Sequence, residues 1–235
     1  MIKTTLRTLT AIALAASTLT AFAAPITPTY TTFANLPAAT YGGSGIPTDP
    51  SAITVVEART GTLTLGLAAT QRGVGPNLGN NSAGTYLANP GVSSGNASTW
   101  NFDYYVNVSA GSLSDFTYKL FYDFNPGVDT DASLLGAWNL TGSGTTLQDS
   151  QNLGFSFLTT GFPGVITPPA GTFNPNANGE YSFALVAYNL AGREVGRSAI
   201  NVDVGTIPEP ASLSLIGLGL LGLASRRKSA KSKQA

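Results

Sequence analysis

The stretch that decides the fold is WNFDYYVNV, residues 100–108. Its apolar side chains occupy every second position, at Trp100, Phe102, Tyr104, Val106 and Val108, and they alternate with Asn101, Asp103, Tyr105 and Asn107. A period of two predicts a β-strand with an apolar face and a mostly polar face. The run FTYKLFYDF, residues 116–124, repeats this alternation after a turn at residues 110–112. Both runs therefore predict half-buried strands.

Shorter runs of the same kind lie outward from this pair, at residues 53–56, 62–67, 181–189 and 198–204, with a possible seventh at Gly154–Leu158. The sequence NLAGREVG predicts a hairpin connection with Gly192 at its bend. About seven short strands predict an all-β domain, an antiparallel β-sandwich of Ig-like or jelly-roll-like type, over residues 51–206. Residues 24–50 contain five Pro and are expected to form an extended, loosely ordered lead-in.

Composition excludes several classes of chemistry. The 235 residues include no Cys and no His, so no disulfide framework, thiolate nucleophile, Cys-ligated metal or histidine base is available. Twelve basic and twelve acidic residues cancel, but they are unevenly placed: residues 24–207 hold 11 acidic against 5 basic residues, a net charge of −6. An acidic body disfavours binding to nucleic acid, because phosphate contacts need a basic surface.

The N-terminus has the three-part layout of a secretory signal peptide at residues 1–23. Lys3 and Arg7 precede an apolar stretch, and small side chains at Ala21 and Ala23 predict cleavage before Ala24. A retained membrane anchor is the alternative, but the apolar run is shorter than the roughly 20 residues that a spanning helix needs. We therefore expect the Sec translocon and signal peptidase as partners.

The C-terminus carries a second ordered pattern. Ile207, Pro208, Glu209 and Pro210 form an extended segment, because each proline fixes its own φ and biases the preceding residue away from helix. Residues 211–224 are uncharged and rich in Leu and Gly, and Arg226, Arg227 and Lys228 follow. Fourteen helical residues span about 21 Å, less than the ~30 Å hydrocarbon core, so a short membrane helix with a transient role is expected. A buried core helix is the alternative.

These features resemble the PEP-CTERM sorting signal. The resemblance rests on Pro208, Glu209 and Pro210, then the Leu/Gly-rich segment, then the basic cluster, all within residues 207–228, with a basic tail at 229–235. It implies a protein exported by a Gram-negative bacterium, transiently held in the inner membrane and processed by an exosortase near the Pro-Glu-Pro motif. The body would then reach the cell surface or extracellular matrix, as in a biofilm. The resemblance implies no activity for the body.

Three further patterns in the body leave alternatives open. Tyr105, Phe121 and Tyr188 lie on polar or mixed strand faces, where they either stack on sugars or pair across strands. Asp123, Asn125, Asp129 and Asp131 are candidate calcium ligands, although the same residue types form ordinary turns. Carboxylates such as Asp103, Asp115, Asp123 and Glu180 suit a glycosidase, but their spacing selects no pair.

The sequence therefore predicts a non-catalytic structural or adhesive body without a resident cofactor. A carbohydrate-binding module is the alternative, with extracellular polysaccharide as a partner, and a carboxylate-dependent glycosidase is a further one.

Overall fold

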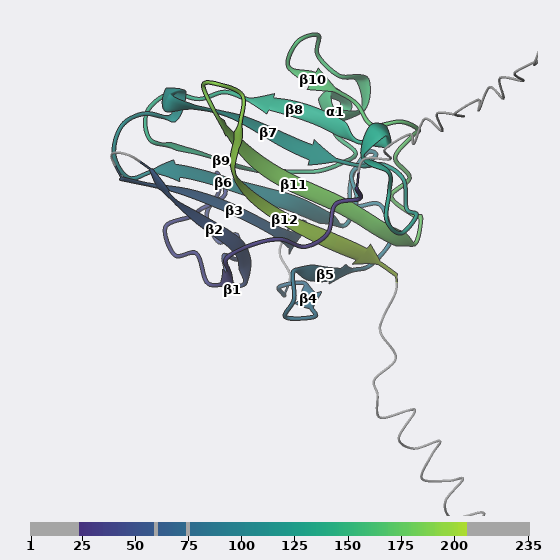
Figure 1. Cartoon of the computed structure of the whole chain (residues 1–235). Coiled ribbons are helices and arrows are strands. Elements are labelled where there is room, and N and C mark those ends of the chain that lie inside the picture. Colours follow the sequence, from purple (N-terminus) through teal and green to yellow (C-terminus); the bar gives the residue numbers. More distant parts are fainter. Residues whose placement is uncertain (1–23, 59–60, 74–75, 206–235) are drawn as a thin grey trace, which may run out of the picture.

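The computed structural model describes residues 24–58, 61–73 and 76–205 (Figure 1). The predicted signal peptide, the sorting motif and the basic tail lie outside these residues. The described part is mostly β and forms two sheets, as the alternation predicts. Between the strands lie three short helical turns: η1 (Leu113–Asp115), η2 (Ala132–Leu134) and α1 (Ser156–Thr160).

The first sheet has five strands in the order β1 (Thr32–Ala34), β2 (Ser51–Ala58), β3 (Gly61–Gln71), β6 (Trp100–Val108) and β9 (Thr146–Gln151). The second has seven strands in the order β10 (Ile166–Thr167), β8 (Gly136–Leu140), β7 (Phe116–Tyr122), β11 (Gly179–Asn189), β12 (Glu194–Val204), β5 (Thr85–Ala88) and β4 (Gly79–Asn80). The seven-stranded sheet is mixed, because β5 pairs parallel to β12. The expectation of purely antiparallel pairing is therefore wrong at this strand.

The core lies between the two sheets, where β6 faces β11. The rings of Phe102 and Phe183 stack with centroids 4.7 Å apart, and Trp100 meets Phe183 edge-on at 6.0 Å. All five predicted apolar positions of β6 are buried, and Tyr118, Leu120 and Tyr122 of β7 are buried too. The predicted alternation of both strands is confirmed.

The predicted turn after β6 carries the chain from one sheet to the other. Ser112 and Asp115 form a capping box around η1: the Asp115 carboxylate accepts from the Ser112 amide at 2.9 Å. The next chain segment then starts β7 in the seven-stranded sheet. The predicted β11–β12 hairpin is confirmed as well, with Gly192 at a φ of 76° in its bend.

Side-chain hydrogen bonds join the sheets where β2 meets β12. The Thr54 hydroxyl donates to the Arg197 carbonyl at 2.7 Å, and the Ser198 hydroxyl donates to the Ala52 carbonyl at 2.6 Å. A Cβ at Gly196 would lie only 2.6 Å from Val56 Cγ2, so the close approach of these strands requires glycine at this position.

The expectation for residues 24–50 is wrong in one respect, because this segment is part of the packed body. Strand β1 pairs with β2, and Leu36 and Tyr41 are buried on the outer face of the five-stranded sheet. Glycine makes room there, since a Cβ at Gly66 would lie 2.6 Å from Leu36 Cδ2. Gln148 Oε1 accepts from the amides of Thr40 and Tyr41 at 2.8 and 2.9 Å. The ordered body therefore begins well before residue 51.

The possible strand at Gly154–Leu158 is also wrong, because the chain forms the helical turn α1 there. Leu158 is fully buried, and its carbonyl accepts from the Tyr122 hydroxyl at 2.9 Å. Gly154 packs directly on the backbone of Asn96, where a side chain would collide. A short apolar run does not distinguish a buried strand from a buried helical turn.

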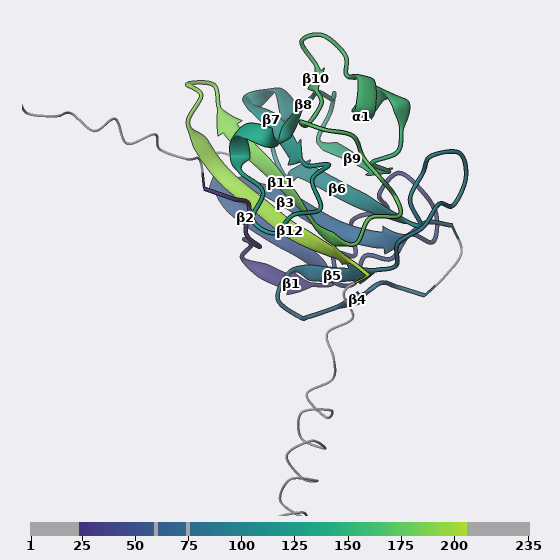
Figure 2. The same ribbon diagram turned by 90° about the vertical axis from the view of Figure 1, so that its right-hand side faces the viewer.

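The first described segment and the end of β12 lie at the same side of the body in Figure 1, which faces the viewer in Figure 2. The hairpins β2–β3 and β11–β12 lie at the opposite end (Figure 1). None of the helices in residues 24–58, 61–73 and 76–205 is long and apolar enough to cross a membrane, and the predicted segment 211–224 lies outside those ranges.

Candidate functional site

The last strand of the body ends at the edge of the predicted sorting segment. Val202 and Val204 are buried, and the Gly205 amide donates to the Ala88 carbonyl at 2.9 Å. Ile207, Pro208, Glu209 and Pro210, and the basic residues Arg226, Arg227 and Lys228, all lie outside the described residues. Only Gly205 separates the end of β12 from residue 206, so the folded body has almost no linker on this side.

Two of the three aromatic candidates share one surface. Phe121 of β7 and Tyr188 of β11 are half-buried on the outer face of the seven-stranded sheet, where they pack on Ile26 and on Val186 and its neighbours. Tyr105 lies on the other sheet and is buried, 4% exposed. The structure therefore brings Phe121 and Tyr188 to one face and excludes Tyr105 from it.

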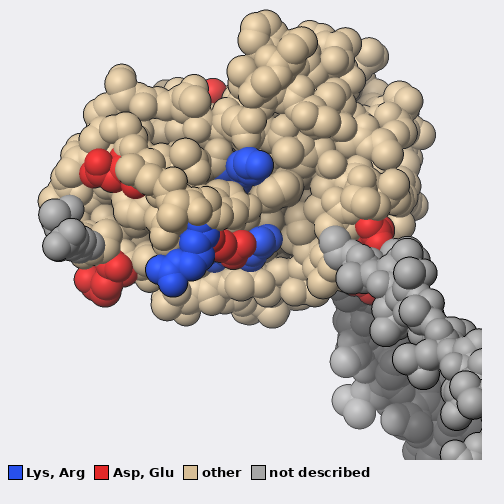
Figure 3. All heavy atoms as spheres, turned by 45° about the horizontal axis from the view of Figure 1, so that its top comes forward, with Lys and Arg blue, Asp and Glu red and all other residues tan. Residues whose placement is uncertain are grey.

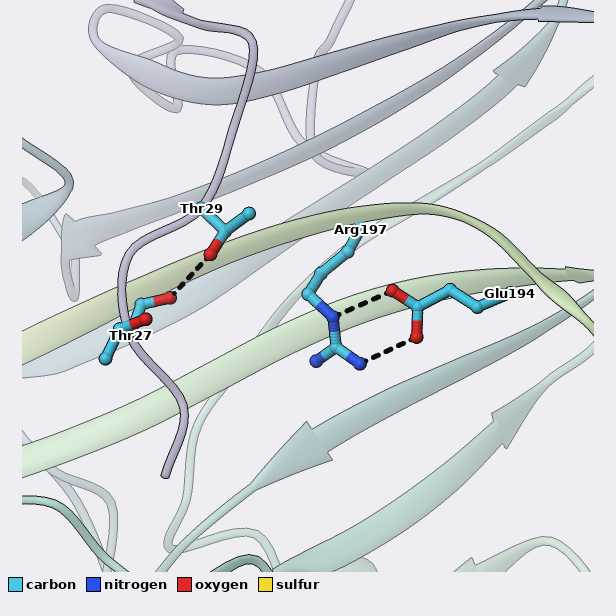
Figure 4. A network of polar contacts seen from close by, with 4 residues as sticks. All are labelled: Thr27, Thr29, Glu194 and Arg197. Atoms are coloured by element: carbon cyan, nitrogen blue, oxygen red, sulfur yellow. Dashed lines mark hydrogen bonds and ion pairs between the residues drawn. The ribbon is translucent and has the colours of Figure 1, made fainter. Parts of the chain in front are cut away.

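The first described residues cross this same face and form a groove with it. Thr29 pairs with Ala199 of β12, and Ile26 is buried against Ala184, Val186 and Ala199. The groove has a volume of about 370 Å³, and its lining includes Ile26, Thr27, Thr29, Phe121, Leu135 and Arg197. Figure 4 shows Thr27 and Thr29 where the first described residues cross the sheet, with Arg197 and Glu194 paired to one side of the crossing. No sequence signal predicts this groove, because it depends on where residues 24–29 cross the sheet.

One basic side chain, Arg197, lines the groove, and Lys119 lies on the same face outside the lining. Lys119 and Arg197 stand in one row across the face, because Val186 pairs with both. Arg197 is 34% exposed and held by Glu194: Nε and one terminal nitrogen donate to the carboxylate at 3.0 and 2.8 Å. Figure 3 shows Lys and Arg gathered in the middle of the visible face, with an acidic side chain between them.

The other end of the face is acidic. Glu180 and Asp203 are directly opposed in the β11–β12 ladder, and Asp123 follows β7 beside Ser182. Asp123 is fully buried; its Oδ1 accepts from the Ser182 amide at 3.2 Å, and its Oδ2 has no partner among the described residues. Burial raises the pKa of Asp123 to about 7, and the nearby Glu180 adds to this rise.

The candidate calcium ligands that follow Asp123 take part in separate local contacts of the backbone. Asp131 accepts from the Ser133 amide at 2.7 Å and caps η2, and Asn125 accepts from the Gly127 amide at 3.0 Å. Asp129 adopts a φ of 57° in the turn between them. Within the described ranges, no three acidic side chains form a group that could hold a metal ion. These contacts are those of a turn, and calcium binding at these residues stays a prediction.

The carboxyl group of Asp103 lies on the outer face of the five-stranded sheet, beneath the segment around Tyr41. It is fully buried, and its Oδ2 accepts from the Thr70 hydroxyl at 2.8 Å. Burial raises the pKa of Asp103 to about 7. The alternation of β6 predicts a solvated position here, so the burial of Asp103 was missed from the sequence.

A larger cleft, about 1080 Å³, opens between the sheets at the end opposite Val204. Its rim includes Asp115, Phe116 and the exposed Leu190 of the β11–β12 hairpin. Of the sequence candidates, only Asp115 lines this cleft, and its carboxylate is already used in the capping box.

Comparison with known protein families gives a match in the C-terminal segment. Residues 206–228 match the PEP-CTERM protein-sorting motif. The chain carries a PEP-CTERM sorting motif. This confirms the resemblance given by Pro208, Glu209, Pro210 and the segment after them. The PEP-CTERM motif supports an exported protein addressed to an exosortase, on a route to the cell surface. Comparison with curated proteins gives no match.

Proposed function

We propose that the chain is an exported precursor whose body is a non-catalytic, structural or adhesive β-sandwich of Ig-like or jelly-roll-like type. Residues 1–23 are removed by signal peptidase after Sec export, and the exosortase acts near Pro208-Glu209-Pro210. The segment 211–224 holds the precursor transiently in the inner membrane, with the basic residues and the tail 229–235 on the cytoplasmic side. The body then reaches the surface or extracellular matrix of a Gram-negative bacterium.

The observation that carries this proposal is the position of β12 relative to the motif. The strand lies inside its sheet, between β11 and β5, and ends at Val204, and the matched motif starts at residue 206. Cleavage within the motif therefore leaves every strand of the body in place.

Two observations support a non-catalytic body. Asp103 and Asp123, the fully buried carboxyl groups with a strongly raised pKa, belong to different sheets and lie on opposite outer sides of the core. They therefore cannot flank one glycosidic bond, as the two carboxylates of a glycosidase do. Asp123 does lie near Glu180, but its side chain is inaccessible to a sugar ring.

The sorting proposal is tested by intact mass. The protein is purified from its native host with and without the exosortase, and the expected mature form lacks residues 226–235 only when the enzyme is present. Exchanging Glu209 for Gln and both prolines for Ala should leave the precursor in the inner membrane. Glu57→Gln, a charge-matched change at an exposed site of the body, should leave processing intact. A mature protein that retains Arg226 would contradict the proposal.

A further inference from the structure

We propose that the groove on the outer face of the seven-stranded sheet binds a carboxylated polysaccharide. This inference rests on the proposed export and adhesive function and names the ligand class for that body. The charge of the body is unevenly distributed. Residues 24–207 carry a net charge of −6, but two of the four described basic residues, Lys119 and Arg197, lie on this face, whereas Arg193 lines the cleft between the sheets.

The face is polarised along its strands. Lys119 and Arg197 form the basic row, and Asp123 follows four residues farther along the β7 direction, about 13 Å away at the rise of a β-strand. Glu180 and Asp203 extend the acidic end. Glu194 offsets the Arg197 charge in part, so an anionic ligand is attracted to this row through Lys119 and the second terminal nitrogen of Arg197, and the acidic end of the face repels it.

The apolar floor lies between these two ends. Ala184, Val186 and Ala199 are fully buried beneath Ile26, Phe121 and Tyr188. Phe121 lines the groove itself, and the partly exposed surface of its ring is apolar, so the C–H face of a sugar can pack against it.

Polar groups of the groove suit a sugar that bears a carboxylate. The Thr27 and Thr29 hydroxyls lie in its wall, and the Thr29 hydroxyl donates to the Thr27 carbonyl at 3.0 Å while keeping its acceptor lone pairs. Glu194 engages Nε and one terminal nitrogen of Arg197, so it orients the guanidinium with the second terminal nitrogen directed away from the pair (Figure 4). A guanidinium held in this way donates to a carboxylate with defined geometry.

Cleavage of the signal peptide would add a positive charge to the groove. Ala24 is the first residue after the predicted cleavage point and lines the groove. Cleavage there creates an α-ammonium group, with an ordinary pKa of about 7.7 to 8.0, at the groove wall. The mature protein would therefore present one more positive charge to the ligand than the precursor does.

A polymer with one carboxylate per sugar fits these features better than nucleic acid does. The body is acidic overall and its basic row is short, whereas nucleic-acid binding needs many phosphate contacts along a basic surface. A carboxylated sugar chain requires only isolated cations, with hydroxyl and ring contacts between them.

The experiment uses the exported, processed protein and two matched polymers: polygalacturonate and its fully methyl-esterified, uncharged form. Affinity electrophoresis and calorimetric titration should show binding to polygalacturonate and at least tenfold weaker binding to the ester. Lys119→Gln should weaken binding about tenfold, the effect of losing one hydrogen-bonded charge. Arg197→Gln combined with Glu194→Gln leaves the net charge unchanged and should also weaken binding about tenfold, because it removes the guanidinium donor. Arg72→Gln removes the same charge from the other sheet and should leave binding unchanged.

Several outcomes would overturn the inference. One is that the protein binds the ester as tightly as polygalacturonate, and another is that Arg72→Gln loses as much affinity as Lys119→Gln. The others are that inorganic phosphate displaces the polymer as readily as galacturonate does, or that protein with a normal melting temperature does not bind at all. Lys119 is exposed, so its variant remains informative if the Arg197 variant unfolds. The intact mass of the same preparations shows, independently of binding, whether the protein has been processed. A correctly processed protein that does not bind the polymer would overturn the proposed binding site in the groove but not the sorting proposal.

Discussion

Thr29 and Ala199 exchange two backbone hydrogen bonds, from the Thr29 amide at 3.0 Å and from the Ala199 amide at 2.7 Å. This pair ties the start of the body to its last strand, and it fixes where residues 24–29 cross the seven-stranded sheet. The groove, the burial of Ile26 and the edge of β12 all depend on it.

Removing one of these hydrogen bonds should loosen the N-terminal crossing. Thr29→Pro deletes the amide donor, and we expect a loss of about 1 kcal/mol in unfolding free energy, together with faster hydrogen exchange at the Ala199 amide. Thr27→Ala, two residues away, removes no backbone donor and serves as the control. Unchanged exchange at Ala199 in Thr29→Pro would contradict the role of this pair.

The aromatic stack between β6 and β11 should dominate the stability of the core. Phe183→Ala removes a fully buried ring that stacks on Phe102, so a loss of about 3 to 5 kcal/mol is expected. Phe162→Ala is the matched change at a ring that is 62% exposed, and it should alter stability by less than about 0.5 kcal/mol. Urea unfolding followed by tryptophan fluorescence measures both. Similar effects of the two changes would be inconsistent with this core.

Stability should fall as the pH rises from about 4 to 7. Burial raises the pKa of Asp103 and of Asp123 from 3.8 to about 7, so in this window the folded protein holds protons that the unfolded chain releases. Each group contributes a slope of up to about 1.4 kcal/mol per pH unit, and the stabilisation is lost by the time the pH passes the folded pKa. Asp103→Asn and Asp123→Asn should each flatten the profile of unfolding free energy against pH. An unaltered slope in the double variant would refute this assignment.

The short distance between β12 and the motif should limit exosortase processing. An enzyme must bind an extended segment, and only Gly205 separates buried Val204 from residue 206. Inserting about six flexible Gly/Ser residues after Gly205 should therefore speed conversion of precursor to mature protein in pulse-chase experiments. The same insertion at Gly192, in the β11–β12 hairpin, is the control. Equal rates for parent and inserted protein would show that the folded body does not hinder access.

The strands that alternate strongly were predictable, and the segments that depend on distant partners were not. Trp100 to Val108 and Phe116 to Tyr122 show their apolar faces in the sequence, and the structure buries those faces. The parallel partner of β12 lies more than a hundred residues earlier in the chain, so no local pattern reveals it. Leu36 and Tyr41 lie among prolines that indicate a loose segment, yet both are buried, and the space over Gly66 admits Leu36.

The same contrast holds for the candidate sites. The sorting motif was predictable because its features are contiguous in the sequence, whereas the groove combines residues near positions 26, 121 and 197. Phe121 and Tyr188 were identified as aromatic residues on polar or mixed faces, but only the strand order places both on one surface. Asp103 was expected on a polar face, and its burial results from the covering segment around Tyr41.

The position of β12 inside its sheet also bears on the order in which the body can assemble. An emerging chain delivers its N-terminus first, so β5, β11 and Thr29 are available before the strand that pairs with all three. The seven-stranded sheet therefore cannot close until almost the whole body has been released. Under the proposed export, this sheet can therefore assemble only after β12 has emerged, and the sorting motif follows directly behind that strand.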